Sequence, residues 1–429
     1  MKKQKISFFT QGCRLNQSET AVLEKGFQKD GHQLVEFDDS PDIVVVNTCT
    51  VTENGDTDTR KLVNKINREA PGAKIALVGC QAQIHKEKLL KYPNVKWVIG
   101  NAQKMQLLRI LSETSNDDAT VVKTEKIERK TFVIENPGVD RHHTRANIKI
   151  QDGCDFFCSF CVIPFARGPA RSRVFGDIFR ECMVLVEAGH QEIVLTGINI
   201  GTYNYEGKSF LDVAIDLERL EGLVRTRISS IEPTTIPDEL IALMAGDNKL
   251  CPYLHIPLQA GTDQILKGMA RKYTIAEFLT CIRKFEKGVP DICIGTDVIV
   301  GFPGETDACF EETVSFLEQA PIHYFHVFSY SERQFARSKK LENPVPAEVI
   351  KERSKRLRQL SKQKKQEFMA SFVGRTKTVL FEMEKKGYWT GLTDNYIRVR
   401  VASPENLENK VRPVKLVSVE DQAMTGHLV

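Results

Sequence analysis

Short apolar runs alternate with helical patterns along most of the chain, and this alternation is the feature that most constrains its fold. In the first segment, up to about residue 120, the runs at 6–9, 43–46 and 74–78 are typical of buried strands, and helical patterns lie near 17–30 and 57–69. Strand–helix–strand alternation predicts an α/β fold, here a parallel α/β sandwich with helices covering the sheet.

The same alternation continues from about residue 143 to residue 340, with helical patterns near 175–190, 262–287 and 306–319. The strand candidates span residues 146–151, 192–199, 227–232, 253–259, 293–301 and 323–330. Six such units predict a partial (β/α)6 barrel of the TIM-like kind, with its chemistry at the carboxyl ends of the strands.

A breaker, Asn343-Pro344-Val345-Pro346, ends this pattern, and a helix follows in which residues 351–365 carry eight basic side chains and one acidic one. The apolar residues Ile350, Leu357, Leu360 and Phe368 share one face of this helix. From about residue 372, short alternating runs predict a small all-β domain. We therefore expect residues 1–118 as an amino-terminal domain, 119–142 as a linker, 143–342 as the barrel, 343–371 as a basic helical connector and 372–429 as the all-β domain.

Size, charge and cysteine content bound the possible functions. A chain of 429 residues is too long for one core, and its net charge of +4 permits a nucleic-acid partner without requiring one. The apolar run near the amino terminus is far too short for a signal peptide or a membrane span, so we expect a cytoplasmic protein. Eleven cysteines in a reducing compartment argue against disulfides and favour metal binding or catalysis.

Three closely spaced cysteines, Cys154, Cys158 and Cys161, directly follow a glycine after the first barrel strand candidate. Thiolates suit iron–sulfur clusters, and spacings of four and three let one loop hold three irons of a cubane. The fourth iron then stays open for a small molecule, as a reactive centre requires. A zinc site is the alternative, but neither His143 nor Cys182 completes a compact zinc motif with the triplet.

This C-x3-C-x2-C triplet, with Phe160 before its last cysteine, resembles that of the radical S-adenosylmethionine superfamily. Phrases at residues 195–199, 229–233, 255–259 and 295–305 are also similar to that family. The resemblance implies that the open iron binds the cofactor and that an electron from the cluster cleaves it to methionine and a 5′-deoxyadenosyl radical. It makes Phe160, Asn199, Glu232 and Gln259 candidate cofactor contacts, although each polar one is equally explained by hydrogen bonding at the barrel mouth.

A second set of cysteines, Cys13, Cys49 and Cys80, is scattered in the sequence but equivalent in position. Each lies just past one of the three strands expected in the first segment. Because the carboxyl ends of parallel strands share one edge, these thiols should converge there, next to Gly12 and Gly79, which permit close backbone approach. This placement predicts a second cluster; the alternative is that the three cysteines are buried apolar fillers.

The phrases around these cysteines, residues 12–20, 47–52 and 79–83, resemble the amino-terminal domain of the radical S-adenosylmethionine methylthiotransferases. The resemblance covers nearly the whole chain and implies a carboxyl-terminal RNA-binding barrel of the TRAM type. It implies S-adenosylmethionine and two [4Fe–4S] clusters, one on Cys154, Cys158 and Cys161 and one on Cys13, Cys49 and Cys80. No catalytic side chain is expected besides these ligands, because the cofactors carry the radical chemistry.

Within this family, residues 12–17 and 151–154 most resemble the branch that adds a methylthio group to C2 of N6-threonylcarbamoyladenosine at tRNA position 37. The alternatives are isopentenyladenosine-37, a ribosomal protein aspartate, or an iron–sulfur RNA-binding regulator without turnover. The implied partners are a tRNA anticodon stem-loop, a flavodoxin- or ferredoxin-like electron donor and a sulfur donor. We expect a monomer with no membrane partner.

Two further basic or aromatic features are compatible with RNA. The basic helix would supply phosphate affinity, and Tyr388, Trp389, Tyr396 and Arg398 would offer stacking surfaces. The alternative is a solvated helix face and an ordinary aromatic core. The arginine-rich loop at 167–173 either neutralises the cofactor carboxylate or contacts anticodon phosphates, and the sequence does not decide between them.

Overall fold

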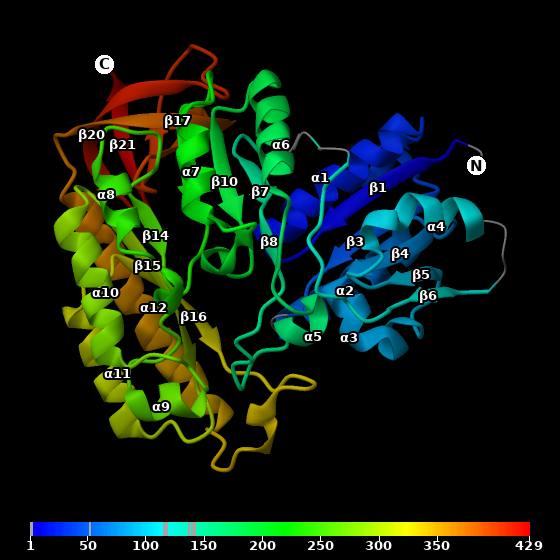
Figure 1. Ribbon diagram of the computed structural model, residues 1–429, viewed down its shortest axis with the longest axis horizontal. Helices are drawn as coiled ribbons and strands as arrows, with labels where there is room; N and C mark the ends of the chain where they lie inside the picture. Colours follow the sequence, from blue (N-terminus) through cyan, green and yellow to red (C-terminus); the bar gives the residue numbers. More distant parts are fainter. Residues whose placement is uncertain (1–2, 51–52, 115–118, 136–137, 139–142) are drawn as a thin grey trace.

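The computed structural model describes residues 3–50, 53–114, 119–135, 138 and 143–429 (Figure 1). The first segment forms a parallel sheet in the order β2-β1-β3-β4-β5-β6. Its strands are β1 (Lys5–Thr10), β2 (Gln33–Leu34), β3 (Ile43–Thr48), β4 (Lys74–Gly79), β5 (Val95–Ile99) and β6 (Val121–Lys123). The predicted α/β sandwich is confirmed. The sequence patterns miss β2, β5 and β6, two of which are too short to show a period.

Helices cover both faces of this sheet. They are α1 (Arg14–Lys29), α2 (Glu53–Glu69), α3 (Cys80–Leu89) and α4 (Leu107–Thr114). Ile43 and Val45 of β3 pack in the same apolar cluster as residues of α1 and α4, whereas Val44 and Val46 pack with residues of α2 and α3. A strand buried on both sides has no polar face, which explains its continuous β-branched sequence.

The second segment forms two three-stranded parallel sheets, β13-β10-β7 and β14-β15-β16. Their strands are β7 (Ala146–Lys149), β10 (Glu192–Thr196), β13 (Arg225–Ile228), β14 (Tyr253–His255), β15 (Cys293–Val300) and β16 (Tyr324–Ser329). A bridge between Thr226 and Leu250 and a hydrogen bond from Ile231 N to His255 O (3.1 Å) join the two sheets. The result is the predicted partial (β/α)6 barrel.

The barrel helices are α6 (Phe175–Glu187), α7 (Phe210–Glu218), α8 (Glu239–Ala245), α9 (Asp263–Gly268), α10 (Ile275–Gly288) and α11 (Asp307–Gln319). The single helix predicted at 262–287 is wrong, because two helices occupy this range. The Thr274 hydroxyl accepts a hydrogen bond from Glu277 N, and the Glu277 carboxylate accepts one from Thr274 N. This capping box starts a new helix at Ile275.

The last segment consists of α12 (Ala347–Ala370) and a closed barrel in the order β17-β18-β19-β21-β20. The barrel strands are β17 (Thr376–Lys385), β18 (Tyr388–Thr393), β19 (Arg398–Val401), β20 (Val411–Glu420) and β21 (Ala423–Leu428), of which β21 is not predicted. Arg225 and Arg227 on β13 donate to the carbonyl oxygens of Leu392 and Thr393, at 3.0 and 3.3 Å, and so attach this small barrel to the larger one. Within the described residues, no helix has both the length and the apolar character needed to cross a bilayer.

Candidate active site

One cavity of about 750 Å³ lies where the three segments meet. Cys13 of the second set and the whole triplet, Cys154, Cys158 and Cys161, line it. The carboxyl-terminal barrel contributes Tyr396 to its wall. A cavity of this volume is within the range of small-molecule and cofactor sites, and the carboxyl ends of parallel strands are where α/β folds place such sites.

The triplet occupies the loop between β8 (Gln151–Asp152) and α5 (Ile163–Arg167). Backbone N–H groups of Phe156 and Ile163 donate to the sulfurs of Cys154 and Cys161, at 3.5 and 3.4 Å. Arg271 donates to the Cys158 sulfur at 3.2 Å. These donors stabilise negative charge on sulfur, as a thiolate-bound cluster requires.

Burial of the triplet opposes its ionisation when no metal is bound. It raises the pKa of the Cys154 thiol to about 11 and that of Cys161 to about 12. Metal binding must therefore displace protons from these thiols. Of the two residues considered for zinc, His143 lines the cavity, whereas Cys182 is fully buried in the apolar core of the barrel.

The second set of cysteines is arranged by the register of the first sheet. Thr48 of β3 is paired with Gly79 of β4, so Cys49 and Cys80 follow partnered residues at the same edge. Gly12, next to Cys13, packs so closely on Cys49 that a Cβ on Gly12 would lie 2.7 Å from the Cys49 sulfur. Only glycine fits there, which is how the backbone admits a sulfur-rich group.

Two helices begin at these thiols. Cys13 is the N-cap of α1, and Cys80 is the first residue of α3. Helix amino termini carry partial positive charge, which favours an anionic group such as a thiolate-ligated cluster. Asn101 donates to the Cys80 sulfur at 3.4 Å and to the carbonyl oxygen of Ala166 in α5 at 2.8 Å, so one amide connects the second set to the triplet segment.

All four predicted cofactor contacts, Phe160, Asn199, Glu232 and Gln259, line the same cavity. The buried Asn199 side chain accepts a hydrogen bond from Thr235 (3.0 Å), but its Nδ2 has no partner. An unused buried donor in a cavity wall fits a polar ligand that would complete its hydrogen bonding. The carboxylate of Glu232 is buried and pairs with Arg271.

Several cavity residues were not identified as site residues from the sequence. Arg271 lies in the loop between α9 and α10 and has no motif-like context. His255 and Asp297 lie in phrases that resemble the family, and their side chains form an ion pair at 3.0 Å between Nε2 and Oδ1. His326 completes a group of three metal-type ligands whose ligand atoms lie within 4.8 Å of one another.

A buried ion network joins the first segment to the barrel beside both cysteine sets. Glu19 of α1 pairs with Lys104, with Lys149 of β7 (2.7 Å) and with Arg167 of α5 (3.1 Å). Asp152 pairs with Lys149 (2.6 Å) and Arg167 (3.0 Å). Burial alone would raise the pKa of Glu19, but the three cations outweigh burial and hold that pKa well below its usual range.

The arginine-rich loop at 167–173 contributes to this network and to a similar one nearby. Arg167 and Arg173 are fully buried, and Arg171 pairs with Asp152. Arg173 pairs with Asp177 of α6. Both roles considered for this loop, binding the cofactor carboxylate and binding anticodon phosphates, are therefore wrong for these arginines, whose charges are used inside the protein.

Comparison with known proteins identifies the family. Residues 148–317 match the Radical SAM superfamily, and residues 5–100 match "Uncharacterized protein family UPF0004". The chain is 35% identical to threonylcarbamoyladenosine tRNA methylthiotransferase MtaB of Bacillus subtilis, covering 96% of this chain and 93% of that protein. The chain belongs to the radical S-adenosylmethionine methylthiotransferase family. This family uses S-adenosylmethionine and two [4Fe–4S] clusters, which fits a cavity lined by the whole triplet and by Cys13 of the second set.

Other relatives point to the same family. The chain is 36% identical to MtaB of Aquifex aeolicus over 92% of this chain and 96% of that protein. It is 31% identical to tRNA-2-methylthio-N(6)-dimethylallyladenosine synthase of Staphylococcus epidermidis over 98% of this chain and 84% of that protein. Among solved structures, the methyltransferase TsrM from Kitasatospora setae has a TM-score of 0.56 at 16% identity, covering 76% of this chain and 75% of that chain, which is a likeness of fold.

Some of the side chains predicted to bind RNA are paired or covered within the protein. On α12, Arg353 pairs with Glu305, Arg356 with Glu311 and Lys362 with Asp421, so part of the basic charge of this helix is neutralised within the protein. Trp389 packs in the core of the small barrel, and Tyr396 faces the cavity, so neither offers an outer stacking surface.

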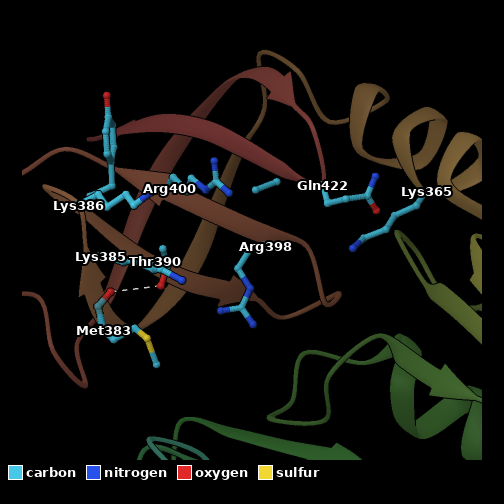
Figure 2. A pocket seen from close by; sticks show the side chains of 10 residues that line it. Lys365, Met383, Lys385, Lys386, Thr390, Arg398, Arg400 and Gln422 are labelled. Carbon is cyan, nitrogen blue, oxygen red and sulfur yellow. Dashed lines mark hydrogen bonds between the residues drawn. The ribbon is translucent and has the colours of Figure 1, made fainter. Parts of the chain in front are cut away.

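A basic hollow of about 720 Å³ lies instead on the small barrel (Figure 2). Lys385, Lys386 and Arg400 line it, and among the described residues no carboxylate pairs with any of them. Tyr388, 47% exposed, lies beside them. The hollow therefore combines unneutralised positive charge with an exposed aromatic ring.

The ion network gives a first prediction. Replacing Glu19 by Gln leaves Lys104, Lys149 and Arg167 buried with too little negative charge, which should cost roughly 3–5 kcal/mol of stability. The midpoint of urea unfolding should fall accordingly. Glu69→Gln, which removes an exposed carboxylate from pairs with Lys65 and Arg68, is the control and should leave the midpoint unchanged. Equal midpoints for the two variants would contradict the role assigned to the network.

Proposed function

We propose that this methylthiotransferase converts N6-threonylcarbamoyladenosine at position 37 of tRNA to its 2-methylthio derivative. The observation that carries the proposal is the shared cavity: Cys13 and the triplet line one space of nucleoside size in a chain whose relatives include the MtaB enzymes. Isopentenyladenosine-37 and a ribosomal protein aspartate are the alternative substrates, and a regulator without turnover is the non-enzymatic alternative.

The chemistry explains why two clusters are needed. An aromatic C–H at C2 offers neither an acidic proton nor a leaving group, so acid–base catalysis gives no route to substitution. When bound, S-adenosylmethionine and the clusters supply the 5′-deoxyadenosyl radical that removes this hydrogen and the methylthio group that replaces it. In our proposal Cys154, Cys158 and Cys161 hold one cluster, and Cys13, Cys49 and Cys80 hold the other.

In this proposal, side chains of the protein bind S-adenosylmethionine and orient the cluster loop. Asn199 offers its unused Nδ2 to S-adenosylmethionine, and Phe160, Glu232 and Gln259 complete that part of the wall. Arg271 contacts both the Cys158 sulfur and the Glu232 carboxylate, so it fixes the cluster loop relative to the cofactor wall. The guanidinium of Arg167 lies close enough to Cys80 and Cys13 to interact electrostatically with both sulfurs.

Recognition of tRNA falls to the small barrel in this proposal. Lys385, Lys386 and Arg400 would contact phosphates of the anticodon stem-loop, and Tyr388 would stack on a base, as in a TRAM-type RNA-binding domain. The hollow and the cavity adjoin along the chain, because Arg398 at the start of β19 lines the first and Tyr396, two residues before it, lines the second.

The remaining expectations follow from the substrate and the cofactors. We place the protein in the cytoplasm, where tRNA is modified. A flavodoxin- or ferredoxin-like protein would supply electrons, and a separate donor would replace the sulfur consumed. We expect a monomer, since all three segments that form the cavity wall come from one chain.

The proposed reaction has a direct test. Anaerobically reconstituted protein, given reductant, S-adenosylmethionine and tRNA bearing threonylcarbamoyladenosine, should form the methylthio nucleoside, detected by mass spectrometry after nuclease digestion. A variant with Cys154, Cys158 and Cys161 all changed to Ala should form none. Methylthiolation of isopentenyladenosine tRNA alone would favour the sister substrate, and absence of 5′-deoxyadenosine would favour the regulator.

The RNA-binding hollow gives a separate prediction. Replacing Lys385, Lys386 and Arg400 by Gln should weaken binding of an anticodon stem-loop and lower the slope of log affinity against log salt by about one per side chain. Fluorescence anisotropy across a salt series measures both quantities. Lys362→Gln, which removes a lysine already paired with Asp421, is the control. An unchanged slope in the triple variant would place the RNA elsewhere.

A further inference from the structure

Among the residues that the structure describes, no carboxylate forms an ion pair with Arg14. It begins α1 directly after Cys13 and lines the shared cavity. Its Nη2 donates to the hydroxyl of Tyr396 at 3.0 Å, and its Nη1 is buried without a hydrogen-bond partner. A guanidinium has five N–H donors, so Arg14 keeps unused donors and a full charge at the cavity wall.

The other arginines of this cavity are already paired. Arg145 forms an ion pair with Glu382 at 2.8 Å, and Arg271 pairs with Glu232. Among the described residues, no carboxylate lies within ion-pair distance of Arg14. A half-buried guanidinium without a counter-ion is costly unless a ligand supplies the negative charge.

Side chains around Arg14 show that positive charge dominates this side of the cavity. The ring of Tyr396 stacks on that of Tyr253 with centroids 4.4 Å apart. Burial alone would raise the pKa of Tyr396, but the charges of Arg14, Arg145 and other arginines outweigh burial and lower it. The cavity is therefore positive on the side where the first segment meets the small barrel.

This side is distinct from the wall assigned to the cofactor. Asn199, Glu232 and Gln259 all follow strands of the (β/α)6 barrel, whereas Arg14 and Tyr396 come from the other two segments. Besides the cluster proposed on the neighbouring Cys13, the second ligand of the cavity, the nucleoside, can supply a negative group to Arg14. Threonylcarbamoyladenosine carries the carboxylate of its threonine, whereas the isopentenyl group of the sister substrate is uncharged.

We propose that Arg14 binds the threonine carboxylate of threonylcarbamoyladenosine and so selects this nucleoside over adenosines with uncharged N6 substituents. The inference rests on the function proposed above. A guanidinium matches a carboxylate with two parallel hydrogen bonds, a geometry that a lysine does not reproduce.

The test compares three stem-loops that bear adenosine, threonylcarbamoyladenosine or its methyl ester at position 37. Binding to the reconstituted, unreduced protein is measured with S-adenosylmethionine present. The wild type should prefer the free carboxylate over the ester by about 10- to 100-fold, the size expected for hydrogen bonds to a charged group. Arg14→Gln should abolish this preference, and Arg14→Lys should retain part of it. Arg400→Gln, on the outer hollow, should weaken all three RNAs alike and keep the preference.

Iron content checks that the Arg14 variants remain intact, and it should match the wild type. A preference that survives in Arg14→Gln would overturn the inference, as would an equal loss for all three RNAs, which would mark a phosphate contact. A change confined to the affinity for S-adenosylmethionine would assign Arg14 to the cofactor and overturn the inference too. If the wild type instead showed no preference and formed no methylthio product, the proposed function itself would fail.

Discussion

The arrangement of the whole site depends on the buried ions between α1 and the barrel. Glu19 belongs to the first segment, while Lys149, Asp152 and Arg167 belong to the barrel, and all four side chains are at most 10% exposed. Buried charges tolerate little displacement, because each one is costly when it loses its partner. The network therefore fixes how the two segments face each other. The network stabilises the fold at pH values above the usual carboxyl range. This contribution is lost as the pH falls through the lowered pKa of Glu19.

This fixed relation brings Cys13 of the second set and the whole triplet to one cavity. Arg167 ends α5, the short helix that directly follows the triplet, and it also donates to Asn16 just past Cys13 at 2.6 Å. One arginine thus connects α5, which follows the triplet, to α1, which follows Cys13. The small barrel closes the third side, because Arg227 of the larger barrel contacts its carbonyl groups and Arg14 contacts its Tyr396. Arg14, to which we assign substrate selection, therefore also helps to hold the small barrel in place.

Much of this was predictable from the sequence. Strand–helix alternation and the three long apolar runs predict the first sheet, and placement of each cysteine after a strand predicts their convergence, because parallel strands end at one edge. The triplet and the candidate cofactor contacts were found from spacing and from family resemblance, and the structure places these contacts on one cavity, though their roles stay predictions.

The rest required coordinates. Nothing local shows that Arg167 is buried, because its partner Glu19 comes from another segment. The partner of Arg173, Glu181, lies in the following helix α6, but the pattern does not show that this pair is buried. For the same reason the basic stripe of α12 predicted a phosphate surface, although acidic residues of α11 and the small barrel neutralise part of it. The two helices in the range 262–287 were merged because one glycine, Gly268, is a weak break signal, and the capping box at Thr274 that starts α10 was not recognised. The sequence does not single out Arg14 either, because the lack of a paired carboxylate among the described residues arises only in the folded cavity.

The central claim is that two separate three-thiolate clusters face one cavity, and EPR spectroscopy combined with iron analysis tests it most directly. The reconstituted full chain should hold about eight irons, and changing either set of three cysteines to Ala should leave about four. In the reduced wild type, the two cluster signals should broaden each other magnetically, and neither triple variant should show this broadening. Eight irons with a wild-type spectrum equal to the sum of the two variant spectra would contradict the shared cavity.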